Sequence, residues 1–371
     1  MITALPERVA GLPPHLRDVW ARMFDVHGTT GRTIPPPAMA AWIERQFGNL
    51  RDVQEQTIVR VINRLTLEET LFNPLRARRP ASSVAHGETL ETWIAEELAG
   101  RDMFRHPEEA TTADVFGRIR GKFCVTAANV AKYEGWHDLV IFDEPHPLRW
   151  NRAQLRDYFD TAWRWLLAAH AHDATAVYPI IAWNCLPKSG ATLMHGHMQI
   201  ALAHGQAYAH VEQWRRAAAH YRAAWRRTYF DDLFALQAAL ELAVLDTADV
   251  RAFASLTPQR SREMVLLGAA GAPRGHERMA AQIQSLADGL YDLLRGLMDG
   301  QGMRAFNVGV ALPPLGRVAE DWSDVPIFAR VMDRGAALSC HSDIGAIELM
   351  ATGCVVTDPF DVAARLRMSL R

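Results

Sequence analysis

Polar and apolar residues alternate most clearly in the middle of the chain, at the end of segment 184–205. Successive side chains of a strand point to opposite faces, so His195, His197 and Gln199 would share one face. The residues between them are a glycine and a methionine, and Ile200 opens an apolar run. We therefore expect a half-buried strand that presents two imidazoles and an amide together.

Helical periodicity flanks this strand on both sides. Apolar residues recur at helical spacing in segment 151–172, where Asn151 can cap the first turn. The apolar run 176–183 predicts a strand that enters the loop before the histidines. Beyond the histidine strand, 206–245 predicts a long helical stretch. The order strand, helix, strand recurs more weakly in the second half of the chain, at 264–268, 277–298 and 304–312.

The first part of the chain divides into a helical and a β-rich region. We interpret residues 1–70 as an amphipathic helical extension, broken at Pro35–Pro37, because segment 39–65 repeats apolar residues at helical spacing. Segment 122–142 instead predicts a strand, a turn at Gly135 and a second strand.

Composition excludes several classes of protein. The chain has 371 residues, 49% of them hydrophobic and 22% charged, which is ordinary for a globular protein with a large core. A net charge of −2 gives no basic field to attract nucleic acid. The four cysteines are widely scattered, so neither a disulfide framework nor a cysteine zinc site can be assigned. The sequence shows no signal-peptide pattern and no membrane-length apolar run, and we expect a cytoplasmic protein.

A small, hydroxyl-rich loop precedes the histidine strand. Segment 188–192 reads Lys-Ser-Gly-Ala-Thr. Backbone N–H groups and hydroxyls of such a loop can approach a phosphate closely, because the small side chains leave room. A row of imidazoles beside a phosphate-binding loop indicates nucleotidyl transfer. His-x-His on a strand also occurs in metal pairs and on solvent-exposed faces, so the motif alone leaves those interpretations open.

The same stretch resembles the active-site strand of the histidine-triad superfamily, in its galactose-1-phosphate uridylyltransferase-like branch. Segment 195–199 reads His-Gly-His-Met-Gln, similar to that branch's His-Pro-His-x-Gln. The branch places an Asn, a Gly and a Ser thirteen, seven and five residues before the nucleophilic histidine, and this chain has Asn184, Gly190 and Thr192 there. Glycine in place of the proline is a departure that would loosen the backbone.

The resemblance implies an α/β (α+β) protein of two histidine-triad-like halves, each an antiparallel sheet flanked by helices. It covers roughly residues 72–371 and is strongest at 184–199. We divide the chain into a helical extension at 1–70, a catalytic half at 71–205, and a helical connection with a degenerate second half at 206–371. Whether the protein forms a homodimer is left open.

The resemblance also implies a role for each residue of the motif. In the branch, the second histidine attacks the α-phosphorus of a nucleotide, so His197 would be the nucleophile, with its other ring nitrogen held by a backbone carbonyl. His195 would position the pair of histidines or bind a residual metal. Gln199 would hold the phosphate. The phosphoryl oxygens would accept hydrogen bonds from the loop and the strand before it, from Asn184, Ser189, Gly190 and Thr192.

Two further segments resemble substrate-binding parts of the branch. Asn129 is the candidate for holding the nucleoside, although an asparagine there could simply make a turn. His137 fits a surface histidine better than a phosphate-side residue. In the C-terminal tail, Glu348 matches an acceptor-side glutamate, while two neighbouring residues that hold galactose 1-phosphate in the branch are not kept.

The zinc ligands of the branch are mostly missing. Its cysteine pair falls at Asp102 and Arg105, and only His146 and His195 match its histidine ligands. A structural zinc normally needs four ligands. We therefore expect a vestigial site.

The second metal-binding His-x-His of the branch is replaced by Asn-Val-Gly at 307–309. We accordingly assign no firm cofactor and no metal ligand. Residual zinc is the alternative, if Asp102 or His106 restores the first site in another form, since carboxylate and imidazole also bind zinc.

We predict a nucleotidyltransferase that transfers a nucleoside monophosphate through a covalent nucleotidyl-histidine. The donor would be a nucleotide sugar or another nucleotide, and the acceptor a phosphorylated compound, as in the galactose-1-phosphate uridylyltransferases. One alternative is a nucleotide-sugar or dinucleoside polyphosphate phosphorylase, in which inorganic phosphate attacks the same intermediate. The other is a non-catalytic nucleotide-binding relative, which the missing metals favour and the intact histidine row opposes.

Overall fold

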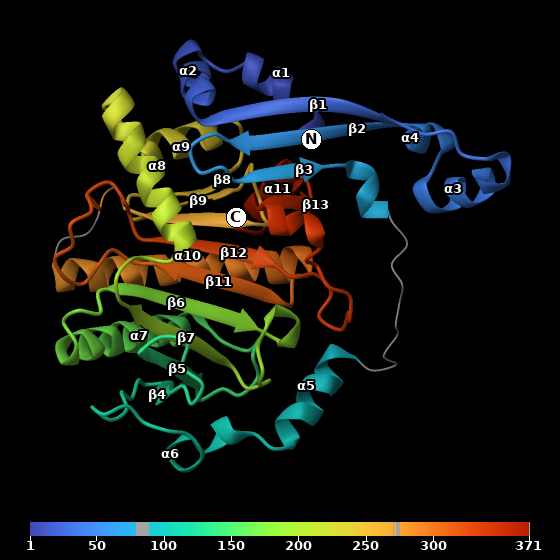
Figure 1. Cartoon of the computed structure of the whole chain (residues 1–371). Helices are drawn as coiled ribbons and strands as arrows, with labels where there is room; N and C mark the ends of the chain where they lie inside the picture. Colours follow the sequence, from blue (N-terminus) through green and yellow to red (C-terminus); the bar gives the residue numbers. More distant parts are fainter. Residues whose placement is uncertain (79–88, 270, 272–274, 371) are drawn as a thin grey trace.

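Nine strands form the central sheet of the protein (Figure 1). The structure is a computed structural model that describes residues 1–78, 89–269, 271 and 275–370. Its strands follow the order β4-β5-β7-β6-β11-β12-β10-β9-β8, and the neighbours are antiparallel. Their bounds are β4 Cys124–Ala128, β5 Trp136–Phe142, β6 Tyr178–Cys185, β7 His197–Ala203, β8 Ala243–Asp246, β9 Val250–Ala254, β10 Met264–Gly268, β11 Phe306–Ala311 and β12 Phe328–Asp333.

The sheet consists of two halves with the same topology. In each half, two strands are joined by a long helix, and the strand that follows them in sequence lies between them. β7 thus lies between β5 and β6, and β12 lies between β10 and β11. β6 and β11 pair at the centre, with Trp183 opposite Val308, so the halves share one continuous sheet. The predicted fold class is confirmed, and the second half extends past the strand expected at 304–312 as far as β12.

Two long helices, α7 (Arg152–His172) and α10 (His276–Gln301), pack side by side against the sheet. Asn151 caps α7 as predicted. Its side chain accepts a hydrogen bond from the Gln154 N–H, and the Gln154 side chain accepts one from the Asn151 N–H. The two helices are joined by ion pairs from Arg152 and Arg156 to Asp288.

The helices cover the face of the sheet opposite to the histidines. Tyr158 of α7 stacks on Phe142, with ring centroids 3.8 Å apart. The neighbouring residue in β5, Ile141, points to the other face and pairs with His197 of β7. The face that carries His197 is therefore not covered by α7.

A second, four-stranded sheet occupies much of the N-terminal region. Its order is β1-β2-β3-β13, and β13 runs parallel to β3. The prediction of a helical extension at 1–70 is therefore wrong over much of that range. In β2, Val59 and Val61 are buried on either side of exposed Arg60, a two-residue period that a helical interpretation overlooks. The bounds are β1 Phe24–Arg32, β2 Glu55–Asn63, β3 Glu69–Phe72 and β13 Thr352–Val355.

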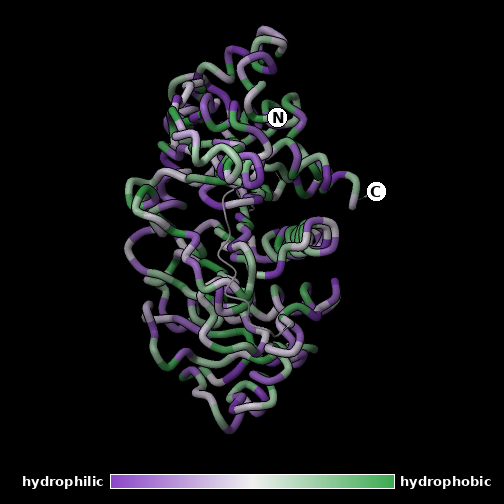
Figure 2. The backbone as a smooth tube through the Cα atoms, turned by 90° about the vertical axis from the view of Figure 1, so that its right-hand side faces the viewer, coloured by the Kyte–Doolittle hydropathy of each residue, from purple (hydrophilic) through white to green (hydrophobic). Residues whose placement is uncertain are grey.

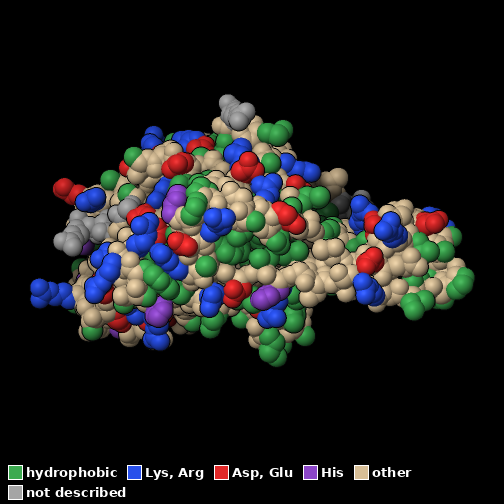
Figure 3. Space-filling model, turned by 90° about the horizontal axis from the view of Figure 1, so that it is seen from above, with side chains coloured by type: hydrophobic (Ala, Val, Ile, Leu, Met, Phe, Trp, Pro, Cys, Tyr) green, Lys and Arg blue, Asp and Glu red, His purple; other side chains and the backbone are tan. Residues whose placement is uncertain are grey.

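The paired strands β1 and β2 extend into an arm that projects from the body and ends in α3 (Ala40–Phe47) and α4 (Leu50–Gln54) (Figures 1 and 3). Ile34, at the turn into α3, is 97% exposed, and Met39 and Trp42 are also exposed. The helices α1 (Leu5–Ala10) and α2 (Pro14–Met23) precede the arm.

The stretch expected to be one helix at 206–245 is two helices, α8 (Ala209–Trp225) and α9 (Tyr229–Ala239). Arg226 separates them in a left-handed conformation, with φ of 56°. Glu348, the predicted acceptor-side residue of the tail, lies on the 3₁₀ turn η6 (Ala346–Met350). The other helices are α5 Leu90–Ala99, α6 Pro107–Ala110 and α11 Pro359–Ser369, and the other 3₁₀ turns are η1 Ile2–Ala4, η2 Pro37–Met39, η3 Pro74–Arg78, η4 Met103–Arg105 and η5 Pro187–Ser189.

Hydrophobic and hydrophilic positions are interleaved along the whole tube in Figure 2, and both termini lie in its upper half. Apolar side chains from both halves of the central sheet share one large buried cluster, which includes Met198, Ile200, Leu266 and Val308. A second, smaller cluster contains Phe104, Val125, Ala127 and Ile141. Within the described ranges, no helix is both long enough and apolar enough to cross a membrane.

Candidate active site

His197 is the first residue of β7, on the sheet face away from α7. Its Nδ1 lies 2.7 Å from the carbonyl oxygen of His195, so Nδ1 carries the proton and donates it. The lone pair is left on Nε2, which has no hydrogen-bond partner among the residues that the structure describes. Burial lowers the pKa of His197, which keeps the ring neutral and nucleophilic near pH 7.

His195 is fixed at both ring nitrogens. Nδ1 lies 2.8 Å from Oδ2 of Asp102, and Nε2 lies 2.8 Å from the carbonyl oxygen of Phe142. The ring of Phe104 stands edge-on to both histidines, with centroids 5.8 Å from His195 and 5.2 Å from His197. The segment that follows α5 therefore covers the histidines and limits the access of water to them.

Gly196, which stands where the related enzymes have proline, is firmly held. Its N–H donates to the carbonyl of Pro145 at 2.9 Å, and its carbonyl accepts from the N–H of Phe142 at 3.0 Å. A Cβ at this position would lie 2.7 Å from the Phe142 ring. Proline has no N–H and would carry that Cβ, so the expectation that glycine loosens this backbone is wrong.

The loop before β7 presents one of its two predicted hydroxyls. Thr192 is exposed, and within the described part of the chain its hydroxyl has no partner. The hydroxyl of Ser189 is buried and donates to the carbonyl of Cys185 at 2.6 Å, so it does not face a phosphate, contrary to expectation. Gly190 has a φ of 97°, which favours glycine, and its N–H donates to Pro187.

His137 is buried, contrary to the surface position that we expected, and it orients Gln199. The N–H of Tyr133 lies 3.3 Å from Nδ1 of His137, which makes Nδ1 the acceptor and assigns the ring proton to Nε2. Nε2 in turn lies 3.2 Å from Oε1 of Gln199. Because its oxygen is engaged, Gln199 keeps its NH₂ group for a substrate. Burial lowers the pKa of His137.

Asn129 makes a turn at the end of β4. Its Oδ1 accepts a hydrogen bond from the N–H of Ala131 at 3.0 Å, and its backbone N–H donates to the carbonyl of His137 at 3.1 Å. These contacts place it next to the residue that orients Gln199. A contact between Asn129 and a nucleoside stays a prediction.

Asn184 lies beside His197. Ala182 of β6 pairs with Gln199 of β7, and the same register carried two residues further places Asn184 opposite His197. Oδ1 of Asn184 accepts from Nδ2 of Asn307 on β11, 2.7 Å away. Asn184 therefore keeps its NH₂ group, and not its oxygen, for a substrate.

Arg334, at the end of β12, fixes Asn307. Its Nη1 donates to Oδ1 of Asn307 at 2.6 Å, while Nδ2 of Asn307 also donates to the carbonyl of Ser189 at 2.8 Å. Asp343 holds Arg334 through two contacts of 2.5 and 2.8 Å. A chain of hydrogen bonds thus leads from the second half of the fold to Asn184 of β6 and to the loop before the histidine strand.

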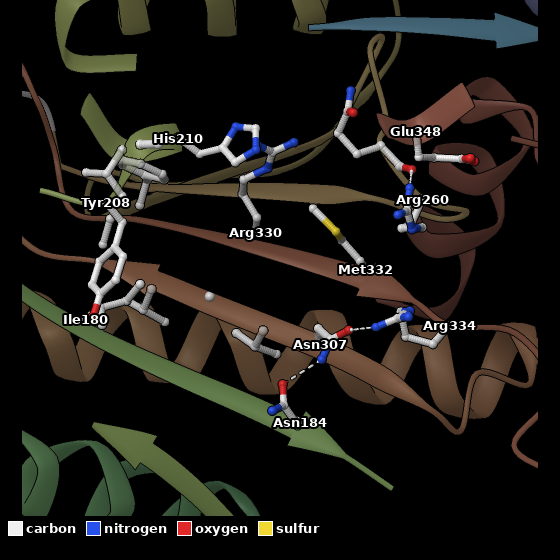
Figure 4. Close-up of a pocket in the computed structure, with 18 of the residues that line it drawn as sticks. Ile180, Asn184, Tyr208, His210, Arg260, Asn307, Arg330, Met332, Arg334 and Glu348 are labelled. Atoms are coloured by element: carbon white, nitrogen blue, oxygen red, sulfur yellow. Dashed lines mark hydrogen bonds between the residues drawn. The ribbon is translucent and has the colours of Figure 1, made fainter. Parts of the chain in front are cut away.

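A cavity of about 750 Å³ opens beside Asn184 (Figure 4). Residues of β6, β11 and β12 line it, with Tyr208 and His210 at one end and Arg260 and Glu348 at the other. Glu348, the predicted acceptor-side residue, thus lines the same cavity as Asn184 but lies across it.

Solved structures with the same fold are found at low sequence identity. An ADP-glucose phosphorylase from Arabidopsis thaliana with bound ADP-glucose is 14% identical, over 82% of this chain and 96% of its own, with a TM-score of 0.64. A uridylyltransferase is 13% identical, over 83% of this chain and 97% of its own, with a TM-score of 0.58. This chain has a uridylyltransferase-like fold.

A GalT-like protein from Arabidopsis thaliana shares the uridylyltransferase-like fold, with 14% identity over 72% of this chain and 92% of its own and a TM-score of 0.60. No protein-family model matches the sequence, and no curated protein sequence does. Identities of 13–14% show the fold alone.

The uridylyltransferase-like fold brings most of the predicted residues to one place, the start of β7 with the loop before it and the end of β6. They are Asn184, Gly190, Thr192, His195, His197 and Gln199. Two contributors were missed by sequence reasoning, His137 and Asn307. The alternation in 136–142 could have placed His137 on the site face, whereas Asn307 reaches the site only through the pairing of β11 with β6.

Proposed function

We propose that this chain is a nucleotidyltransferase in which Nε2 of His197 carries a nucleoside monophosphate between a nucleotide donor and a phosphorylated acceptor. One observation carries the proposal. Nδ1 of His197 is tied to the carbonyl of His195 at 2.7 Å, which leaves the lone pair on Nε2, and the strand register puts Asn184 and Gln199 on the same face of the sheet as His197. A neutral imidazole held in this way is a nucleophile near pH 7.

The transfer takes two balanced steps. The lone pair of Nε2 attacks the α-phosphorus of the donor, an N–P bond forms, and the bond from phosphorus to the bridging oxygen breaks, so that the leaving phosphate takes the electron pair. A phosphate oxygen of the acceptor then attacks the same phosphorus. The N–P bond breaks, and its electron pair returns to Nε2 of His197 as a neutral imidazole. During both steps Nδ1 of His197 keeps its proton and donates it in a hydrogen bond to the His195 carbonyl.

Three donors are available to the phosphoryl oxygens as negative charge builds on them. They are the NH₂ groups of Asn184 and Gln199 and the hydroxyl of Thr192. Asn307 and His137 engage the oxygens of the two amides, so the donors need no reorganisation when the reaction occurs. The Ser189 hydroxyl is engaged by Cys185, and we assign it to the support of the loop.

The identity of the acceptor separates two versions of the proposal. A sugar phosphate would make the protein a transferase of the uridylyltransferase kind, and inorganic phosphate would make it a phosphorylase. Arg260, which lines the cavity beside Asn184, suits an anionic acceptor of either kind. Arg334 lines the same cavity, but its guanidinium is already held by Asp343 and Asn307. The phosphorylase among the structurally similar proteins, which has ADP-glucose bound, supports a test of inorganic phosphate with nucleotide sugars.

Intact-mass spectrometry tests the proposal. The protein is incubated with nucleotide sugars and dinucleoside polyphosphates one at a time, without an acceptor. We expect a mass gain of one nucleoside monophosphate that is acid-labile and that disappears when the acceptor is added. Clearance by inorganic phosphate alone would assign the phosphorylase version.

His197→Gly should form no adduct, and His15→Ala, a change at an exposed histidine of α2, should form it normally. Turnover of a donor without any adduct, or an adduct on His197→Gly, would overturn the mechanism.

A further inference from the structure

A hydrogen bond between two buried side chains holds the segment where related enzymes carry their zinc cysteines. Oδ2 of Asp102 lies 2.8 Å from Nδ1 of His195, 93 residues away in sequence. The side chains of Asp102 and His195 are only 5% and 4% exposed. A buried carboxylate next to a buried imidazole is costly unless each is paired, and here each pairs with the other.

The hydrogen bonds of His195 leave no electron pair for a metal. A histidine binds zinc through a ring nitrogen that carries no proton. In this ring Nδ1 faces a carboxylate oxygen and Nε2 faces the carbonyl oxygen of Phe142, 2.8 Å away, and both oxygens are acceptors. Both ring nitrogens are thus engaged by protein oxygens, and neither is directed at a metal.

The other positions of the expected zinc site do not complete it. The guanidinium of Arg105 donates to the carbonyl of Leu98 at 2.8 Å, which places a cation where a thiolate would be needed. Nε2 of His146 lies 3.3 Å from Glu91, and Nδ1 accepts from the N–H of Leu148. No group of three potential ligands of the His, Cys, Asp and Glu types occurs in the part of the chain that the structure describes.

We propose that Asp102 replaces the zinc of related enzymes as a metal-free positioning residue for the catalytic strand. The same carboxylate accepts from the N–H of Phe104 at 3.0 Å, so it joins the start of η4 to His195. Phe104 then covers His197, and the carbonyl of His195 holds Nδ1 of His197. The connection that a metal would make by coordination is made here by one carboxylate.

The metal part of the proposal is tested on the full chain, purified without metal-affinity chromatography and dialysed with zinc. Elemental analysis should find far less than one zinc per chain, and a chelator should leave the midpoint of thermal unfolding unchanged. About one zinc per chain, whose removal lowers the midpoint, would overturn the proposal. Neither readout depends on enzymatic activity, so a failure here is distinct from a failure of the proposed function.

The positioning part rests on the proposed function and is tested by Asp102→Asn. We expect a lower unfolding midpoint and an adduct that forms about 10–100-fold more slowly, the range typical of residues that orient another ligand or nucleophile. The donor concentration at half-maximal rate should stay unchanged, because the phosphate contacts lie on other residues.

Glu109→Gln, which removes an exposed charge from the same segment, is the matched control and should behave as wild type. A normal adduct rate in Asp102→Asn, or a loss of donor binding instead of rate, would overturn the positioning role. Full recovery of the Asp102→Asn variant by added zinc would do so as well.

Discussion

The side chains of Asn184 and Asn307 meet where β6 pairs with β11, with Nδ2 of Asn307 2.7 Å from Oδ1 of Asn184. The two residues belong to opposite halves of the fold. The second half has no histidine row of its own, yet it sets the direction in which an amide of the first half can donate. Through this contact the second half of the fold takes part in the candidate site.

Asn307→Asp should slow the formation of the adduct. A carboxylate cannot donate to Oδ1 of Asn184, so the Asn184 amide would turn its NH₂ group toward the new carboxylate and away from the substrate. Losing one preorganised donor typically costs about 10²–10³ in rate. The rate is measured by quenched intact-mass spectrometry. Asn49→Asp is the matched control, because Asn49 caps α4 and aspartate caps equally well. Equal rates in both variants would contradict the role of Asn307.

The two hydroxyls of the loop, those of Thr192 and Ser189, should have different roles, one in the reaction and the other in stability. Thr192→Ala should slow adduct formation by about 10²–10³ with little effect on stability, because an exposed hydroxyl without a partner serves only the substrate. Ser189→Ala should instead reduce the free energy of unfolding by about 1 kcal/mol, because it removes a buried hydrogen bond to Cys185. Denaturant unfolding and the adduct rate are measured on both variants. The opposite pattern would return Ser189 to the phosphate site.

Gly196→Pro should destabilise the protein even though it restores the motif of related enzymes. The change removes the N–H that donates to Pro145 and adds a Cβ 2.7 Å from the Phe142 ring. Lost hydrogen bonding and overpacking each cost about 1–3 kcal/mol in unfolding free energy. Gly28→Ala serves as the control, since a Cβ there would meet no atom within 4 Å. An unchanged denaturation midpoint in Gly196→Pro would show that this backbone can rearrange freely.

The sequence predicted the parts of the site that are local and periodic. The two-residue period placed His195, His197 and Gln199 on one face, and the resemblance to the family motif indicated Asn184 and Thr192. It could not predict contacts that depend on pairing between distant segments, such as that of Asp102 with His195. The first two N-terminal strands, β1 and β2, were missed because they pair across a connection that contains α3 and α4, and because their short apolar runs fit helical spacing as well. The direction of the Ser189 hydroxyl also follows from the turn geometry rather than from residue type.

The pH dependence of adduct formation should follow the histidine nucleophile. Burial lowers the pKa of His197 below its usual 6.5, so the ring stays neutral in the folded protein to a lower pH than a free histidine would. The acid limb of the adduct rate should therefore have its midpoint below pH 6.5. His15→Ala should leave this profile unchanged. A midpoint at or above 6.5 would show that a different group controls the reaction.

The lowered pKa of His197 also determines the direction in which the stability of the protein changes with pH. Below pH 6.5 the unfolded chain binds more protons at His197 and His137 than the folded chain does. Their contribution to the free energy of unfolding is thus fully present above pH 6.5 and is lost as the pH falls toward the folded-state values. Denaturant unfolding in the range just below pH 6.5 should show this decline, and a flat profile would contradict it.

Arg330 of β12 should be the side chain whose loss most weakens the junction between the two sheets. Its guanidinium pairs with Glu68, in the connection between β2 and β3, and with Glu263, just before β10. All three side chains are buried, and burial raises the pKa of Glu263 even with Arg330 present. Arg330→Met leaves two buried carboxylates without a counterion, and we expect a loss of about 3–5 kcal/mol in unfolding free energy at pH 7.

The loss in Arg330→Met should also depend on pH in a definite direction. Without the guanidinium, the pKa of Glu263 in the folded state rises further above that of the unfolded chain. The folded variant then binds more protons, so its stability falls as the pH increases. The difference from wild type should be smaller at pH 5 than at pH 8, and adding Glu263→Gln to the variant should recover part of it. Arg32→Met, which breaks an exposed pair with Glu55, should cost less than about 1 kcal/mol. Similar losses in the two arginine variants would show that the buried pairs contribute no more than a surface contact does.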